Sequence, residues 1–361
     1  MFRMKKILVF ALLALSSGSG VALAAGLPAA MPECSGRLTF TLPGDFDIAS
    51  VPYQTLLKNI SVFGRGEGFR FTDREPAEFA KVRYLGPMLI SDELVEREIS
   101  DAVKIFKDEK NRRAKNKSTD VNRPFGIVNV PKFAKDFEAW SEGDELRVLF
   151  RLKQHLLYVS VNNSENVSEN IASAVGLSKN VEFREKSKVP PRNAICLPYA
   201  VVKQGEQGAF GEVATLYKLK LHPDVTIMVS DSTMFANASA SSDRTMAEKA
   251  AINDFWGQNQ LYADVEKIEK GFPLKNGRSI ELAGQKGTAS YVRIVRKNGA
   301  VDYGYYGVSH GSLGKMSESN IGIYIITHSQ LAKDKSITPV SSDEFLKMVD
   351  LVQNSMRMID N

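Results

Sequence analysis

The sequence predicts an α+β fold in two domains, each built from a mainly antiparallel sheet with packed helices. Segments with strand character are joined by hairpin-type turns, and stretches with helical periodicity interrupt them. The chain has 361 residues and 43% hydrophobic composition, which is enough to bury two cores. A polar stretch at 186–192 ends in a pair of prolines and suits a domain boundary near residue 190.

The first 24 residues have the pattern of a cleavable secretory leader. Arg3, Lys5 and Lys6 precede the apolar run 7–15, and a small-residue stretch ends in Ala-Leu-Ala at 22–24. The apolar run is shorter than the ~20 residues that span a bilayer, and no comparable stretch follows. We therefore expect a soluble mature protein that begins near Ala25, lies outside the cytoplasm and makes no stable membrane insertion.

The first domain, residues 25–190, is predicted to contain a sheet interrupted by one long helix. Ser91 and Asp92 can cap this helix, whose apolar residues recur at helical spacing from Val95 to Phe106. The last two strands of the domain are expected to form a hairpin, and a short helix at 164–175 follows them. The predicted strands are 37–42, 59–63, 68–72, 125–130, 138–140, 146–152 and 156–161.

The second domain, residues 191–361, opens at a strand around Cys196. Turn residues at 222–224 and an Asn-Gly pair at 298–299 predict two hairpins. Helical spacing is found at 246–255 and 261–268, and the closing helix has Ser341 and Glu344 as a capping box. The predicted strands are 195–197, 213–221, 225–229, 279–282, 289–295, 301–308 and 320–327.

The charge of the mature chain argues against nucleic acid as a partner. The whole chain carries +5, and the leader contributes three basic residues and no acid, which leaves +2 for residues 25–361. Proteins that bind nucleic acid normally have a clearly basic surface. The near balance of charge therefore removes that class.

Cys34 and Cys196 are the only cysteines, and both remain after removal of the leader. In an oxidising compartment, a disulfide between them is the expected state, and two unrelated buried thiols are the alternative. Two thiols alone do not make a structural zinc site.

Candidate catalytic residues are few. The four histidines show no paired metal-binding spacing. The segment Ser309-His310-Gly311-Ser312 lacks the glycine-flanked serine of a nucleophile elbow and is interpreted as a loop at a strand end. The glycine-rich stretches at 64–68 and 284–288 lack the spacing of a phosphate-binding loop. We expect no catalytic residue, metal or cofactor.

Three segments are candidate contacts with a protein partner. Tyr303, Tyr305 and Tyr306 lie on one predicted strand whose two faces would each present a phenol. The alternative is aromatic pairing that stabilises the sheet. The segment 107–117 carries six basic residues, including Arg112 and Arg113, and is interpreted as a solvated helix end and loop. A Ser- and Ala-rich loop at 231–243 is a third candidate contact.

Several short motifs together resemble the periplasmic immunity proteins of type VI secretion phospholipase effectors. These motifs are Cys34-Ser35-Gly36-Arg37 followed by Leu42-Pro43, Ile195-Cys196-Leu197, the turn from Gly284 to Gly287, and Ser342-Asp343-Glu344 leading to Asp350 and Ser355-Met356-Arg357. The resemblance extends over most of the mature chain.

This resemblance implies an N-terminal and a C-terminal immunity domain that meet near residue 190, and inhibition of a cognate lipase by protein binding without catalysis. Two other functions stay open from the residues alone. An exported hydrolase would use Ser309, His310 or Ser312, and a periplasmic module would bind a small ligand or an envelope component.

Overall fold

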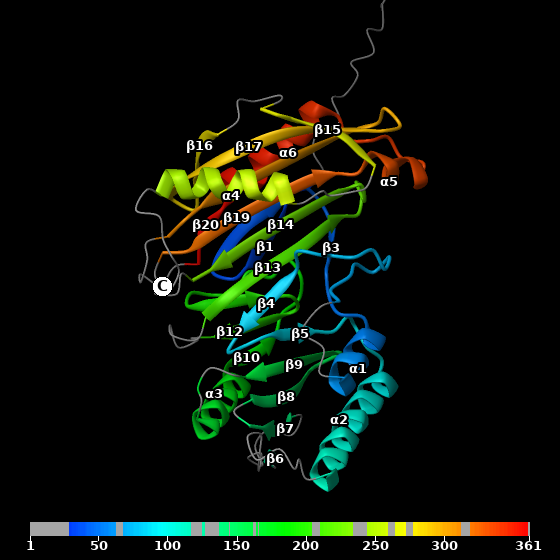
Figure 1. Ribbon diagram of the computed structural model, residues 1–361, viewed down its shortest axis with the longest axis vertical. Coiled ribbons are helices and arrows are strands. Elements are labelled where there is room, and N and C mark those ends of the chain that lie inside the picture. The colour runs from blue at the N-terminus through cyan, green and yellow to red at the C-terminus, as the bar shows by residue number, and fades with distance from the viewer. Residues whose placement is uncertain are drawn as a thin grey trace, which may run out of the picture.

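The molecule is elongated, with a large antiparallel sheet at one end and a smaller antiparallel sheet at the other (Figure 1). The computed structural model describes residues 29–62, 68–116, 125–126, 137–143, 145–161, 164, 166–203, 210–233, 244–258, 264–271, 277–311 and 318–359. The predicted leader therefore lies outside the described residues. The predicted α+β class is confirmed.

Helices and strands alternate irregularly along the chain. The described helices are α1 (Tyr53–Val62), α2 (Glu96–Asn116), α3 (Val167–Asn180), α4 (Arg244–Gln258), α5 (Ser329–Asp334) and α6 (Ser342–Ser355). The described strands are β1 (Met31–Ser35), β2 (Leu38–Leu42), β3 (Phe46–Ile48), β4 (Lys81–Tyr84), β5 (Met88–Ile90), β6 (Phe125–Gly126), β7 (Phe137–Glu142), β8 (Glu145–Leu152), β9 (His155–Val161), β10 (Val181–Phe183), β11 (Ala194–Leu197), β12 (Ala200–Lys203), β13 (Phe210–Leu219), β14 (Val225–Ser232), β15 (Val265–Lys270), β16 (Arg278–Leu282), β17 (Gln285–Arg296), β18 (Val301–Ser309), β19 (Asn320–Thr327) and β20 (Arg357–Met358). Among these helices, none is long and apolar enough to cross a membrane.

The larger sheet has nine strands and contains both hairpins predicted in the second half of the chain. Its order is β15-β17-β18-β19-β14-β13-β3, with β16 beside β17 and β4 beside β13. The hairpin β13–β14 turns at 220–224, and the hairpin β17–β18 turns at 297–300. Both predictions are confirmed, because proline and Asn-Gly at these turns act locally.

Both faces of the larger sheet are covered. Helix α4 packs on β17 and β18 at one face, whereas α6 and the small sheet β1-β2-β20 pack on the other face (Figure 1). Side chains alternate along β19, so that Ile323 and Ile325 join the core under α6, and Tyr324 and Ile326 join the core on the α4 face. The sheet is therefore the centre of a three-layer arrangement.

The smaller sheet has the order β5-β9-β8-β7-β6 and includes the predicted β8–β9 hairpin. Helix α2 packs against β7 and β8, and α3 packs against β8 (Figure 1). Ile99, Ala102 and Phe106 form the buried side of α2, as their spacing predicts. Val95 is 64% exposed, because α2 begins one residue after it.

The two halves of the chain share strands. β3 and β4 pair with β13, and β20 pairs with β2. The predicted boundary near residue 190 lies between β10 and β11, which both pair with β12. The division into domains 25–190 and 191–361 stays a prediction, and the pairing shows that strands from before residue 190 complete the sheet of the second half.

Two local predictions in the first half are wrong. Residues 59–62 form the end of α1 instead of a strand, because Leu56 and Ile60 are spaced for one helical face and are buried. The strand predicted at 68–72 is reduced to isolated bridges of Arg70 with Ser50 and with Pro76.

Two predictions about helix extent also fail. Residues 265–270 form β15 at the sheet edge, and the register shifts between Val265 and Lys267. Because of this irregularity, Val265 and Ile268 pack against the same core although they are three residues apart, a spacing that is typical of a helix. The basic segment continues as α2 to Asn116, because lysine and arginine favour both helical conformation and a helix C-terminus.

The closing helix is confirmed together with its cap. The hydroxyl of Ser341 accepts a hydrogen bond from the Glu344 N–H at 3.3 Å. The predicted apolar face is buried, and it consists of Phe345, Met348, Val349, Val352 and Met356. This helix, α6, packs on β2 and on the face of the larger sheet opposite α4.

Candidate partner-binding surface

The predicted disulfide between Cys34 and Cys196 is present and joins β1 to β11. The two residues are 1% and 0% exposed. Beside the disulfide, hydrogen bonds connect the backbones of Gly36 and Cys196 in both directions, at 2.9 and 2.7 Å. The crosslink therefore fixes the first strand of the described chain to the segment after residue 190.

A buried ion pair lies next to the disulfide. The Arg184 guanidinium is 2.6 Å from the Glu33 carboxylate, and their side chains are 3% and 0% exposed. Glu33 also accepts hydrogen bonds from the N–H groups of Cys34 and Ser187, at 2.9 and 2.8 Å. The charge of Glu33 is thus compensated inside the protein.

A second ion pair joins Arg37 to Asp231. The backbone N–H and the guanidinium of Arg37 donate to the Asp231 carboxylate over 2.7 to 2.9 Å, and the guanidinium also reaches Ser319. Gly36 has φ +59°, and a Cβ at this position would lie 2.6 Å from the Cβ of Asp231. Glycine is therefore required here. Asp231 is 0% exposed, so this first residue of the predicted contact loop is structural; residues 234–243 lie outside the described residues.

Of the three predicted contact tyrosines, the structure buries Tyr305 completely and Tyr306 in part. Tyr305 is 0% exposed, and its hydroxyl donates to Gln353 at 2.7 Å. Tyr306 stacks on Phe255 of α4 with ring centroids 4.1 Å apart. Burial raises the pKa of both phenols. These two tyrosines stabilise the layers of the larger sheet.

Besides Tyr306, three predicted contact residues keep exposed surface. The Tyr303 ring is partly exposed and packs on Phe345. Arg112 and Arg113 lie near the end of α2, and both donate to the Glu109 carboxylate, at 2.8 and 2.9 Å. The shared carboxylate holds the two guanidinium groups together. Their role in partner binding stays a prediction.

The predicted serine and histidine loop does not form a nucleophile pair among the described residues. Ser309 is 0% exposed, and its hydroxyl donates to the Lys286 carbonyl at 2.8 Å and accepts from Arg244 at 3.0 Å. No hydrogen bond joins Ser309 to a histidine ring in the part of the chain that the structure describes. Ser312 lies outside the described residues. Ser309 therefore serves as a bridge between β17, β18 and α4.

The histidines lie in separate surroundings. His155 stacks on Tyr199 with ring centroids 4.5 Å apart, and His222 is 3.4 Å from Glu344. His310 follows β18, and His328 precedes α5. Across the described ranges, no three His, Cys, Asp or Glu side chains are placed to hold a metal ion.

A pocket of about 420 Å³ opens on the larger sheet between α5 and residues 71–79, and we call it the sheet pocket. Its apolar lining comes from Phe71, Pro76, Phe79, Leu216, Tyr324, Ile326 and Leu331. Its polar lining comes from Glu75, Glu78, Thr226, Asp264, Arg296, Asp302, His328, Gln330 and Asp334. Sequence reasoning missed this pocket, because its residues come from segments far apart in the chain.

Ion pairs hold the walls of the sheet pocket. Arg296 contacts Asp302 at 2.5 Å and Asp264 at 2.9 Å. Lys218 is nearly buried, and its ammonium contacts Asp73 and Glu75 at 2.9 and 2.6 Å.

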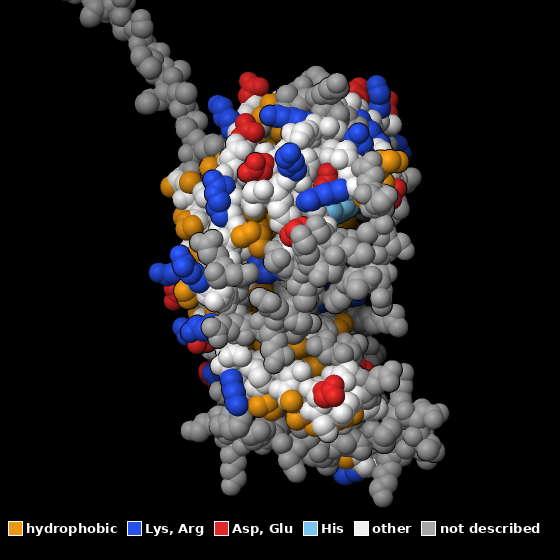
Figure 2. Space-filling view, turned by 90° about the vertical axis from the view of Figure 1, so that its left-hand side faces the viewer, with side chains coloured by type: hydrophobic (Ala, Val, Ile, Leu, Met, Phe, Trp, Pro, Cys, Tyr) orange, Lys and Arg blue, Asp and Glu red, His pale blue; other side chains and the backbone are white. Residues whose placement is uncertain are grey.

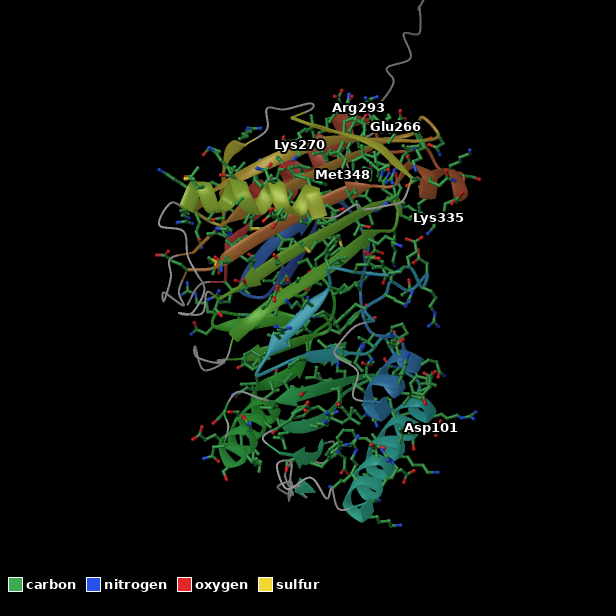
Figure 3. The ribbon with its side chains drawn as sticks, viewed as in Figure 1. Asp101, Glu266, Lys270, Arg293, Lys335 and Met348 are labelled. Carbon is green, nitrogen blue, oxygen red and sulfur yellow. A yellow bond between two sulfur atoms is a disulfide. The ribbon has the colours of Figure 1, made fainter. Side chains whose placement is uncertain are left out.

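Lys335, labelled in Figure 3, follows α5 and contacts the same Asp73 at 2.9 Å. These contacts fix residues 71–79 against the sheet and α5.

Protonation of His328 is expected to destabilise the fold. Burial lowers the pKa of His328 to about 4, against the opposing effect of Asp302 and with the support of Arg296 and Lys218. The unfolded chain, with a histidine pKa near 6.5, binds this proton first as the pH falls. The free energy of unfolding should therefore decrease by about 3 kcal/mol between pH 6.5 and pH 4 on account of this residue. The free energy of unfolding of His328→Gln, measured with urea at several pH values, should depend less steeply on pH in this range than that of the wild type. An unchanged dependence on pH would contradict the assignment.

The arrangement of sheets and helices is the fold of immunity proteins of the type VI secretion system (T6SS). Immunity protein TplEi of the T6SS from Pseudomonas aeruginosa, solved with its "L" peptide, matches with a TM-score of 0.56 and 14% identity, over 92% of this chain and 99% of that chain. A chain of the Tle4–Tli4 complex matches with a TM-score of 0.56 and 16% identity, over 91% and 97%. Apo TplEi matches with a TM-score of 0.53 and 16% identity. No protein-family model and no curated protein match the sequence.

Proposed function

We propose that this chain is an immunity protein that binds and inhibits a cognate type VI secretion phospholipase effector in the periplasm and so protects the producing cell. The observation that carries the proposal is the extent of the fold match, which covers 91–92% of this chain and 97–99% of the T6SS proteins. One of these proteins was solved with a peptide, and another belongs to a two-protein complex. Such a fold suits inhibition through protein contact.

The compartment follows from two features of this chain. The leader pattern at residues 1–24 directs export, and a buried disulfide persists in an oxidising environment. In the periplasm, the two domains, residues 25–190 and 191–361, would stay linked through Cys34 and Cys196 when an effector arrives. The disulfide therefore supports export and a rigid scaffold together.

We infer inhibition without catalysis. Ser309 is the described serine of the candidate nucleophile loop, and its hydroxyl is hydrogen-bonded to the Lys286 carbonyl and to the Arg244 guanidinium. The surface that Figure 2 shows carries Lys and Arg side chains mixed with Asp and Glu, as on many protein-binding surfaces. Arg112, Arg113 and Tyr303 are the candidate contacts, and charged contacts of this kind chiefly set the association rate and specificity.

The test is a titration of residues 25–361 into the product of a neighbouring phospholipase gene. Phospholipase activity should disappear at a sharp molar equivalence, because a tight inhibitor is consumed stoichiometrically. Gel filtration of the mixture should show a complex of the two proteins. Undiminished activity together with separate elution would overturn the proposal for that pair, and a phospholipase from an unrelated locus is the specificity control.

A further inference from the structure

The sheet pocket joins an aromatic and aliphatic floor to a rim with mainly one sign of charge. Five of its lining residues are acidic and one is a permanent base, Arg296. Arg296 is already shared between Asp264 and Asp302. Lys218, whose ammonium lies over the Phe71 ring at 4.4 Å, pairs with Glu75. The remaining carboxylates of the lining outnumber its bases, and the rim is therefore anionic.

Some acceptor groups of the sheet pocket have no cation of their own. Glu78 is exposed and makes no hydrogen bond or ion pair with any described residue. Asp334 accepts a hydrogen bond from Gln330 at 2.7 Å and has no basic partner among the described residues. The pocket thus retains negative charge after its internal pairs are formed.

A nearly buried threonine side chain without a protein partner gives an independent indication of a ligand. Thr226 is 9% exposed and lines the sheet pocket from β14. Its side-chain hydroxyl has no hydrogen-bond partner among the described residues. The protein leaves this hydroxyl open to the pocket, so that a donor or acceptor of a ligand can replace water there.

We propose that the sheet pocket is the docking site for a basic side chain, arginine or lysine, that the effector presents to this protein; this inference rests on the function proposed above. The aliphatic stem of such a residue would lie on Leu216, Ile326 and Leu331, and the cationic head would meet the acidic rim. An arginine head adds stacking on aromatic faces and paired hydrogen bonds to a carboxylate.

The same chemistry disfavours other occupants. An anionic phospholipid or a free phosphate would be repelled by Glu78 and Asp334, which have no basic partner among the described residues. A volume of about 420 Å³ is within the range of ordinary ligand pockets and accommodates a long side chain. The neutral form of His328 near pH 7 adds no positive charge to the lining.

The first test reverses the charge of the rim. In the variant Glu78→Lys with Asp334→Lys, the dissociation constant for the cognate effector should rise roughly 100-fold or more, as for other close charge pairs across interfaces. The matched control is Glu281→Lys with Asp350→Lys, which makes the same change in net charge at exposed residues beside and on α6, on the opposite face. The control should bind like the wild type. Thermal unfolding of both variants checks that each one is folded.

A second test needs no effector. N-acetyl-arginine amide should bind the wild-type protein at millimolar concentration, with chemical shift changes around Thr226, and this binding should be lost in the rim variant. Thr226→Val removes the hydroxyl while conserving shape, and it should weaken binding of the same probe several-fold. Choline serves as a cationic lipid headgroup for comparison.

The outcomes separate this inference from the proposed function. Full inhibition of the effector by the rim variant would overturn the docking site and leave the immunity function intact. Binding of choline but not of N-acetyl-arginine amide would overturn the assignment of an effector side chain. Failure of the wild-type protein to inhibit the effector, with the arginine probe still bound, would overturn the function and the identity of the partner, and it would leave a site for basic side chains.

Discussion

Loss of the Cys34–Cys196 disulfide is expected to lower the free energy of unfolding by about 5 kcal/mol. The crosslink closes a segment with a sequence separation of 162, and a loop of this length removes much conformational entropy from the unfolded chain. Urea unfolding of Cys34→Ala with Cys196→Ala should show this decrease relative to the wild type. The free energy of unfolding should also depend more steeply on the urea concentration, because the unfolded chain without the crosslink is less compact.

Single replacements provide the control for the disulfide. Cys34→Ala alone and Cys196→Ala alone should each cost nearly as much as the double replacement, since either one removes the crosslink. The native protein should resist reduction by dithiothreitol, because the two residues are 1% and 0% exposed. A double variant within about 1 kcal/mol of the wild type would show that the crosslink contributes little to stability.

Elements set by local chemistry were predictable from the sequence. The turn at 220–224, the Asn-Gly turn at 298–299 and the Ser341 cap each depend on a few adjacent residues. The disulfide was predictable because the leader indicates the compartment and the chain has two cysteines.

Features that depend on distant pairing were missed. The ion pairs of Glu33 with Arg184 and of Arg37 with Asp231 join residues that lie far apart in the chain. Neither residue type nor spacing indicates them in a single sequence. The irregular register at Val265 also arises only when β15 meets β17.

Tyr305 and Tyr306 present less surface than strand periodicity predicts, for a definite physical reason. Alternation along a strand places Tyr305 and Tyr306 on opposite faces, and one exposed face would leave one phenol free. In this protein α6 lies over one face, where Tyr305 is fully buried, and α4 lies over the other, where Phe255 stacks on the partly exposed Tyr306. The number of layers around a sheet is a tertiary property, which strand periodicity does not reveal.

Removal of Arg184 should cost about 3–5 kcal/mol in the free energy of unfolding, because it leaves Glu33 charged and buried without its partner. Arg184→Met conserves much of the apolar stem. Adding Glu33→Gln should recover part of the loss, since it removes the buried charge and its single amide oxygen can still accept from one of the two N–H groups, of Cys34 or of Ser187, that donate to the carboxylate. A double-mutant cycle measured by urea unfolding gives the coupling energy of the pair.

Lys203 and Glu182 supply the matched comparison for this pair. They form an ion pair at 2.7 Å across the neighbouring strands β12 and β10, but their side chains are 47% and 53% exposed. Lys203→Met should therefore cost less than about 1 kcal/mol, because solvent screens both charges. Burial would then account for the difference in unfolding free energy lost at two ion pairs of similar length. Equal costs at the two sites would contradict that explanation and would mean that Glu33 finds solvent or another donor when Arg184 is absent.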